Sequence, residues 1–294
     1  MSKLHLGKGV ERMIKAVDIV DVCKSQLDIV QAVAGLIENT VFYDDATKTE
    51  KELDLFETKI YLIEGDSVDG VFFADEYLKD TGREPILVNY ANYTHPGGGF
   101  LRGAYAQEEF LCHHSLLYPV LDGFNNSWYA NHRRDTNGML FRNEAMITSN
   151  MPFARDFNTL TKGNIVPDFY GEEELNEDVA LATVLTIAAP INMYNDTPEK
   201  KRMNKEAFIK RIEFMFKVAA DASAGFSQDM LITGPFGCGA FKQNPKLCSS
   251  VMRRLIDTTY RGTFECVVFA IPDRNSDNYK AFKEAFPEAI EIKA

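Results

Sequence analysis

Two groups of residues that could do chemistry lie close together in the stretch PGGGFLRGAYAQEEF, residues 96–110. The first group is the triple glycine Gly97, Gly98 and Gly99. Without Cβ atoms, its backbone can be approached closely, and its N–H groups can point at phosphate oxygens. The spacing matches neither a P-loop nor the GxGxxG pattern of dinucleotide-binding proteins. A bare triple glycine is also typical of a flexible turn, so the residues that follow decide its interpretation.

The second group is the acidic cluster Gln107, Glu108 and Glu109, where we expect a helix to begin. Carboxylates in a first turn are favoured by the helix dipole, so an ordinary acidic helix start is the simpler interpretation. Adjacent helical residues project about 100° apart. One carboxylate can therefore hold substrate hydroxyls while the other faces a scissile bond, as acid–base cleavage of a glycosidic bond requires.

A second glycine-rich segment, LITGPFGCGAFKQNP at residues 231–245, also follows a predicted strand and precedes a predicted helix. We expect its backbone to form a second phosphate cradle at the same edge of the sheet, so that two loops clamp a diphosphate. The cradle residues are Gly237, Cys238, Gly239 and Ala240. Phe241 offers a flat apolar face for a ribose or a base. No histidine lies near Cys238 in the sequence, so a structural role is favoured over a nucleophilic one.

Asp66 and Ser67 follow the predicted strand YLIE and are candidates for a helix N-cap. A carboxylate at this place could equally accept a hydrogen bond from an adenine amino group. The segment LCHHS, residues 111–115, contains residue types that bind metals. Its adjacent side chains splay apart on a helix, and the sequence offers no complementary Cys/His pair. We therefore expect neither a metal site nor a cofactor.

The elements that must position these residues alternate along the chain. Strand-like apolar runs occur at residues 60–64, 86–90, 144–148, 184–188, 230–233 and 266–271, and helical patterns at 68–79, 107–118, 198–222, 245–260 and 277–286. This alternation predicts a three-layer α/β/α domain with a mostly parallel or mixed sheet. A polar stretch at residues 121–138 is interpreted as a lid or binding loop.

The first 57 residues read as helical, with Val10, Ile14 and Val17 at helical spacing, and they carry no motif. The predicted organisation is therefore a helical N-terminal extension, residues 1–57, followed by a catalytic domain, residues 58–294.

Composition limits the possible partners and compartments. A net charge of −11 and the lack of a long basic block argue against general nucleic-acid binding. Five scattered cysteines without a CxxC pattern suit free thiols in a reducing compartment. The sequence shows neither a secretory signal nor a membrane-spanning run. We expect a cytoplasmic protein without membrane contacts, or a nuclear one if the source is eukaryotic.

Taken together, NYAN…PGGGFLRGAYAQEE resembles the signature of the poly(ADP-ribose) glycohydrolases, and PGGGFL.GA.AQEE with HSLLYPVL resembles the microbial-type branch. GPFGCGAF is similar to the second phosphate loop of that branch. With LTIAAPINMYN, the resemblance extends over about residues 58–272. It implies a macrodomain, in which a mixed sheet lies between helices.

The resemblance also implies a role for individual residues. Glu109 matches the catalytic acid/base and Glu108 the residue that binds the ribose hydroxyls, with Gln107 supporting the pair. Asn92 matches the asparagine that holds the terminal ribose. Less directly, Asp66 matches a macrodomain aspartate that recognises the adenine base.

The two glycine loops match the diphosphate loops of the family, and Phe241 matches the aromatic residue that packs against the terminal ribose. Phe236 is a departure, because the family more usually has tryptophan at that place. We expect its effect to be confined to local packing.

The implied activity is hydrolysis of the ribose–ribose O-glycosidic bond of poly(ADP-ribose) from a chain end, with ADP-ribose as product. Glu109 would protonate the leaving oxygen and then activate water, which favours a buried position for it. Two alternatives remain open. One is a mono-ADP-ribosyl hydrolase that acts on ADP-ribosylated protein or nucleic-acid adducts, and the other is a non-catalytic ADP-ribose-binding macrodomain.

Overall fold

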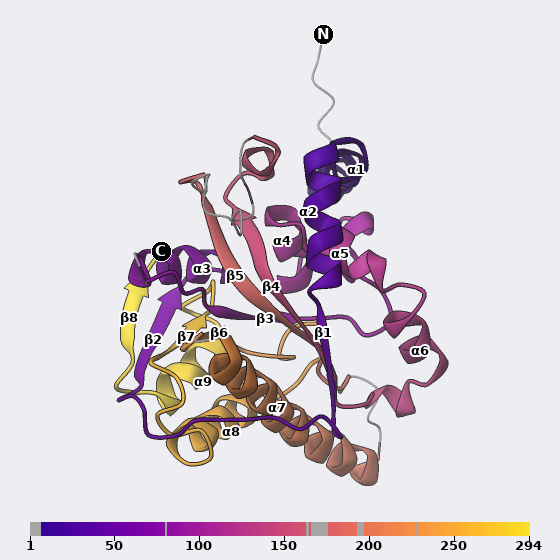
Figure 1. Cartoon of the computed structure of the whole chain (residues 1–294). Helices are drawn as coiled ribbons and strands as arrows, with labels where there is room; N and C mark the ends of the chain where they lie inside the picture. Colours follow the sequence, from indigo (N-terminus) through magenta and orange to yellow (C-terminus); the bar gives the residue numbers. More distant parts are fainter. Residues whose placement is uncertain (1–6, 80, 163–164, 166–175, 193–196, 227) are drawn as a thin grey trace.

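The computed structural model describes residues 7–79, 81–162, 165, 176–192, 197–226 and 228–294. Within them a mixed sheet of eight strands lies between two layers of helices (Figure 1). The strands are β1 Val41–Asp44, β2 Lys59–Glu64, β3 Ile86–Tyr90, β4 Glu144–Ala154, β5 Val179–Ile187, β6 Met230–Thr233, β7 Cys266–Ala270 and β8 Ile290–Lys293. The three-layer α/β/α prediction is confirmed.

The strand order is β1-β4-β5-β3-β6-β7-β2-β8. The six strands from β5 to β8 in this order are parallel, β4 is antiparallel to β5, and β1 is antiparallel to β4. The neighbours β3, β6, β7 and β2 therefore all end at the same edge of the sheet. This arrangement brings together the loops that follow them, although these loops lie far apart in the sequence.

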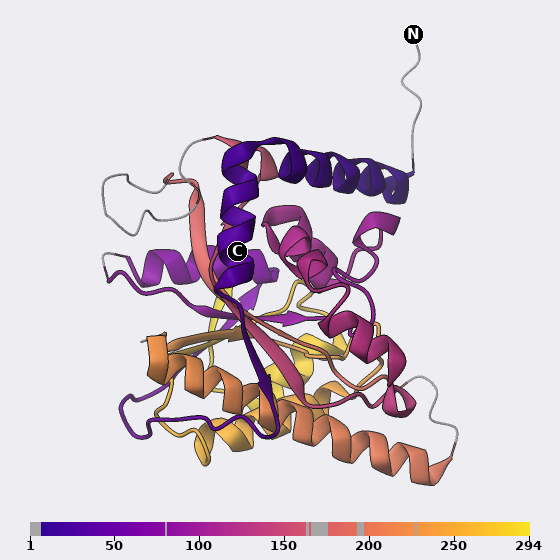
Figure 2. The ribbon, with the colours of Figure 1, turned by 45° about the vertical axis from the view of Figure 1, so that its right-hand side comes forward.

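Helices cover both faces of the sheet (Figures 1 and 2). One face carries α1 Lys8–Ser25, α2 Leu27–Glu38, α3 Ser67–Tyr77, α4 Gln107–His114, α5 Leu117–Gly123 and α6 Trp128–Arg134, and the other carries α7 Pro198–Phe226, α8 Pro245–Asp257 and α9 Asp277–Ala285. Along β2, Tyr61 and Ile63 join the first core while Ile60 and Leu62 join the second. Because successive strand residues point to opposite faces, these continuous apolar strands serve two cores at once.

Several predicted boundaries need correction. Two strands, β1 and β8, were not predicted, since both are short and largely exposed. The polar stretch 121–138 is not one loop, because it contains α6 and the end of α5. The helix predicted for residues 107–118 is two helices, separated where Ser115 is extended and forms a β-bridge to Phe153. Among the described residues, no helix is long and apolar enough to cross a membrane.

The N-terminal segment forms α1 and α2, which confirms the helical extension as far as residue 38. The chain then enters the sheet, since β1 pairs with β4 in the register Val41↔Ile147. The hydroxyl of Tyr43 in β1 also donates a 2.8 Å hydrogen bond to Asp221 in α7. Residues 41–44 are therefore part of the sheet rather than of a helical extension, and a domain boundary at residue 57 stays a prediction.

Candidate active site

A cavity of about 450 Å³ opens at the carboxyl ends of β2, β3, β6 and β7. Its walls come from the segments that follow these four strands, together with α9. The lining residues are Asp66, Ser67, Tyr90, Tyr105, Ala106, Gln107, Phe110, Pro235, Gly239, Ala270, Pro272 and Asn278. The strand order thus brings both glycine-rich segments and the turn at Asp66 to one cavity.

Gln107 fastens the start of α4 to the end of β3. Its side-chain oxygen accepts a 2.8 Å hydrogen bond from the N–H of Tyr90. Its amide nitrogen donates to the carbonyl of Val88 at 2.8 Å and to Ser67 Oγ at 3.1 Å. Gln107 therefore fixes the helix start, and with it the direction of the two glutamates that follow.

Glu108 is a buried carboxyl group, only 3% exposed. Oε2 accepts a 2.8 Å hydrogen bond from the N–H of Asn92, whereas Oε1 makes no hydrogen bond of normal geometry to any residue that the structure describes. Burial raises the pKa of Glu108 well above its usual value, the Asn92 N–H opposes this effect, and the neighbouring charge of Glu109 adds to it. Oε1 of Glu108 is thus a buried oxygen without a hydrogen-bond partner among the described residues, and Glu108 itself does not line the cavity.

Glu109 is held by both of its oxygens and is 8% exposed, as expected for a buried acid. Oε1 accepts from the N–H of Gly99 at 2.7 Å, and Oε2 accepts from the N–H of Ala106 at 3.0 Å. Ala106 also lines the cavity, so the carboxyl group of Glu109 lies next to it. Two backbone donors, at the two ends of the segment 99–106, therefore hold this carboxyl group in one orientation.

The triple glycine makes room for the two carboxyl groups. Gly98 has a left-handed φ of 58°, and a Cβ added to it would lie 2.6 Å from Glu109 Oε1 and 3.0 Å from Glu108 Oε2. Although adjacent helical residues point in different directions, their flexible side chains bring both carboxyl groups to this one glycine. Gly97 packs against the side chains of Cys112 and Tyr118, which leave no room for a Cβ atom at this position.

Two N–H groups of the triple glycine already donate hydrogen bonds within the protein. The N–H of Gly98 donates to the carbonyl of His95, and the N–H of Gly99 donates to the Glu109 carboxyl group. The expected contact between these N–H groups and a diphosphate thus stays a prediction. The contact that the structure does show is between the glycine backbone and the acidic pair.

The second glycine-rich loop retains free donors. Gly239 and Ala240 are exposed, and within the described residues their N–H groups make no hydrogen bond. Gly237 packs against Ala189, and the Cys238 thiol faces the carbonyl of Phe236 at 3.5 Å. This loop is the better placed of the two to receive an anion through its backbone.

Phe236 is fully buried, with its ring 5.6 Å from that of Tyr90. It therefore joins the second loop to the end of β3, in agreement with the packing role expected for it. Phe241 is half-buried against both cores, and its carbonyl accepts a 2.9 Å hydrogen bond from the N–H of Asn192. Neither residue lines the cavity, so contact of Phe241 with a ribose stays a prediction.

Asp66 is the N-cap of α3, and its Oδ1 accepts from the N–H groups of Val68 and Asp69 at 2.8 and 3.0 Å. It also lines the cavity, so its capping role and a contact with a ligand are compatible. Burial raises the pKa of Asp66, and its two backbone hydrogen bonds partly oppose that effect.

Asn92 uses its side-chain oxygen within its own turn, accepting hydrogen bonds from the N–H groups of Thr94 and His95 at 2.8 and 3.1 Å. Its own N–H holds Glu108. Its amide nitrogen makes no hydrogen bond to the described residues, and contact of this donor with a ribose stays a prediction.

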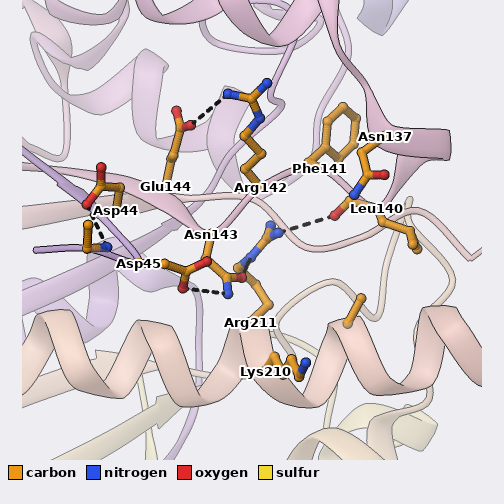
Figure 3. Close-up of a pocket in the computed structure, with 12 residues that line it drawn as sticks. Asp44, Asp45, Asn137, Leu140, Phe141, Arg142, Asn143, Glu144, Lys210 and Arg211 are labelled. Carbon is orange, nitrogen blue, oxygen red and sulfur yellow. Dashed lines mark hydrogen bonds and ion pairs between the residues drawn. The ribbon is translucent and has the colours of Figure 1, made fainter.

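A second cavity, of about 490 Å³, lies near the start of β4 and contains none of the predicted site residues (Figure 3). At its base, the buried Arg211 of α7 donates to Asn143 Oδ1 at 2.8 Å, to the Tyr93 hydroxyl at 2.6 Å, and to the carbonyls of Leu140 and Ala188. These four hydrogen bonds therefore tie α7 to the segments that follow β3 and β5 and to the segment that precedes β4. Since Tyr93 follows Asn92 directly, this hydrogen-bond network stabilises the turn that begins at Asn92.

Several residues of the first cavity were not predicted from the sequence. Tyr105 and Phe110 lie within or next to the recognised motif, so their position was a usable signal. Pro272 and Asn278 lie far from any motif, and only the strand order brings them to the cavity.

Among the described residues, no group of three or more histidine, cysteine or acidic side chains is placed to hold a metal ion. All five cysteines are free.

The sheet order, the two glycine-rich loops at one edge and the buried acidic pair define a macrodomain-like fold. The family model of the microbial-type poly(ADP-ribose) glycohydrolase (PARG) catalytic domain matches residues 8–156. The chain therefore belongs to the microbial-type PARG family.

Solved structures show the same fold. The poly(ADP-ribose) glycohydrolase of Thermomonospora curvata is similar with a TM-score of 0.70 and 24% identity, over 94% of this chain and all of that one. The enzyme of Deinococcus radiodurans, in complex with ADP-ribose, has a TM-score of 0.67 and 24% identity, over 88% of this chain and 98% of that one. A T. curvata structure with the inhibitor ADP-HPD has a TM-score of 0.70 and 23% identity, over 94% of this chain and all of that one. A comparison with curated proteins gave no match.

Proposed function

We propose that this protein is a poly(ADP-ribose) glycohydrolase that cleaves ribose–ribose O-glycosidic bonds from the end of the polymer and releases ADP-ribose. The observation that carries the proposal is the convergence of two buried carboxyl groups on Gly98, next to a cavity that is lined by the adjacent residues Ala106 and Gln107 and by Asp66. A cavity of about 450 Å³ falls within the range of about 300–1,000 Å³ that is usual for small-molecule sites. Family membership and the related structures with ADP-ribose and ADP-HPD support the same conclusion.

In this proposal the ligand lies along the edge of the sheet. The adenine end occupies the cavity near Asp66, and the diphosphate lies against Gly97, Gly98 and Gly99 on one side and Gly237, Cys238, Gly239 and Ala240 on the other. The terminal ribose meets Asn92, Phe241 and the free oxygen of Glu108. Unpartnered N–H groups at Gly239 and Ala240 support the diphosphate position.

Glu109 is proposed as the acid and then the base of the reaction. It donates a proton to the leaving 2′-oxygen as the bond from that oxygen to the anomeric carbon breaks, and the bonding electrons stay on the oxygen. The resulting oxocarbenium-like ribosyl group lies close to the substrate's own phosphate. Glu109, now a carboxylate, takes a proton from water while the water oxygen bonds to the anomeric carbon. Most glycosidases divide these tasks between two carboxyl groups.

The test is Glu109→Gln, which keeps the size of the side chain but cannot transfer the proton. We expect hydrolysis of labelled poly(ADP-ribose) to fall by about 10²–10⁴-fold, the usual contribution of general acid–base catalysis. ADP-ribose should still bind, and the melting temperature should fall only modestly, because the new amide nitrogen must face one of the two backbone N–H groups that donate to Glu109. Near-normal hydrolysis by folded Glu109→Gln would refute the mechanism.

The products, separated by length, also test the remaining parts of the proposal. Release of ADP-ribose alone from early times indicates action at chain ends, whereas shortened oligomers indicate internal cleavage. If the wild type binds ADP-ribose but cleaves neither polymer nor mono-ADP-ribosylated protein, it is a non-catalytic ADP-ribose-binding macrodomain. A cytoplasmic location, or a nuclear one in a eukaryote, stays a prediction that rests on the free cysteines.

A further inference from the structure

The N-terminal helix α1 contacts the loop that joins the triple glycine to the acidic pair. Arg12 Nε donates a 2.9 Å hydrogen bond to the carbonyl of Gly103 in this loop. Gly103 has a left-handed φ of 72°, and a Cβ added to it would collide with the backbone carbonyl of Gly9. Figure 2 shows α1 lying above the helices that follow the triple glycine, and α1 packs against the 3₁₀ turn Phe100–Arg102 and against α4. Two segments about 90 residues apart therefore meet backbone to backbone.

The same arginine also covers an aromatic wall of the cavity. The guanidinium of Arg12 lies 4.9 Å from the centre of the Tyr105 ring, and the ring of Phe110 meets Tyr105 edge-on at 5.5 Å. Tyr105 lines the cavity together with Phe110 and Asp66, yet 57% of it is exposed. It projects from the short segment between Gly103 and α4, which has no regular secondary structure. The contacts with Arg12 and Phe110 therefore order the ring of Tyr105.

We propose that Arg12 is a positioning residue for the base-binding end of the cavity: it holds the Tyr105 ring as a wall of the cavity that Asp66 also lines, so that α1 sets the affinity for the adenosine part of the ligand. This inference rests on the proposed function. A ring that is already ordered loses less conformational freedom when the ligand binds, and the affinity rises accordingly. Within the described residues, Arg12 makes no hydrogen bond or ion pair with Glu108 or Glu109, so we expect it to act on ligand binding rather than on bond cleavage.

The experiment is a double-mutant cycle with Arg12→Ala, Tyr105→Ala and the double variant, read by calorimetric titration with ADP-ribose. We expect Arg12→Ala to weaken binding by about 3- to 10-fold, from loss of an exposed cation–π contact and a charged hydrogen bond. The double variant should bind no more weakly than Tyr105→Ala, since Arg12 acts through Tyr105. Arg12→Lys keeps a cation at the ring without the Nε donor, and its affinity should lie between those of Arg12→Ala and the wild type.

Kinetics separate positioning from general stability. Arg12→Ala should raise KM for the polymer and leave kcat unchanged, the signature of lost uniform binding. Arg134→Ala, an exposed arginine of α6, is the matched control and should change neither value.

Each result points to one conclusion. If the losses caused by Arg12→Ala and Tyr105→Ala multiply in the double variant, or if kcat falls with KM unchanged, Arg12 does not act through Tyr105 and the inference is refuted while the proposed function stands. If the wild type binds ADP-ribose and the cycle behaves as expected but no polymer is cleaved, the hydrolase proposal fails and the positioning role stands. If the wild type does not bind ADP-ribose, both fail.

Discussion

Substitution of Gly98 by alanine tests whether the triple glycine exists to admit the acidic pair. The new methyl group would lie 2.6 Å from Glu109 Oε1 and 3.0 Å from Glu108 Oε2, well inside normal contact distance. The carboxyl groups must therefore move by up to about 1 Å to restore an ordinary carbon–oxygen separation near 3.4–3.5 Å. A displacement of about 1 Å in a catalytic group can cost about 10²-fold in rate. The left-handed φ of 58° adds about 1–2 kcal/mol of backbone strain.

We therefore expect Gly98→Ala to lower kcat for polymer hydrolysis by about 10²-fold or more. Gly82→Ala is the matched control, because Gly82 has a similar φ of 67° but nothing within 4 Å of an added Cβ. This control should show the same backbone strain as a lower melting temperature, with kcat unchanged. The reasoning is refuted if folded Gly98→Ala retains wild-type kcat, or if both variants lose activity in proportion to their loss of stability.

Two further predictions concern stability. Because burial raises the pKa of Glu108, this carboxyl group binds more protons in the folded than in the unfolded state above pH 4.5, so its contribution to the free energy of unfolding should fall as pH rises from 4.5 toward the raised pKa. In urea titrations across pH, the free energy of unfolding of Glu108→Gln minus that of the wild type should therefore rise over this range, and a difference that stays constant would contradict this. Arg211→Lys leaves several buried carbonyl and amide oxygens without their planar donor, so we expect a loss of about 3 kcal/mol in the free energy of unfolding, measured by urea titration at pH 7. A loss below about 0.5 kcal/mol, typical of surface substitutions, would show that Arg211 does not organise the strand ends.

The main pattern of the fold follows from local sequence. Strands buried on both faces are continuous apolar runs, which is why β2, β3, β6 and β7 were located closely from the sequence. The edge strands β1 and β8 were missed because half-exposed, short strands bear no such run. Within β4, an irregular pairing between Thr148 and Met151 interrupts the register, and the predicted strand stopped at this point.

The acidic pair and its glycines could be found from sequence because they lie within one short segment, whose spacing is itself the signal. Their arrangement was decided by tertiary structure. Both glutamate side chains fold back onto Gly98, and glycine N–H groups expected to face a phosphate hold Glu109 or the loop itself. Side-chain direction depends on rotamers and on neighbouring backbone donors, and sequence spacing does not specify either.

Residues contributed by distant segments could be assigned only in three dimensions. The order of the parallel strands brings Pro272 and Asn278 to the cavity that Tyr105 also lines, and the packing of α1 brings Arg12 onto the Tyr105 ring. The amino-acid sequence by itself determined which residues can do chemistry and which helices and strands carry them. The sheet order and the packing of the helices decided which of those residues share a cavity, because the free energy of burying apolar faces depends on contacts between segments that are remote in sequence.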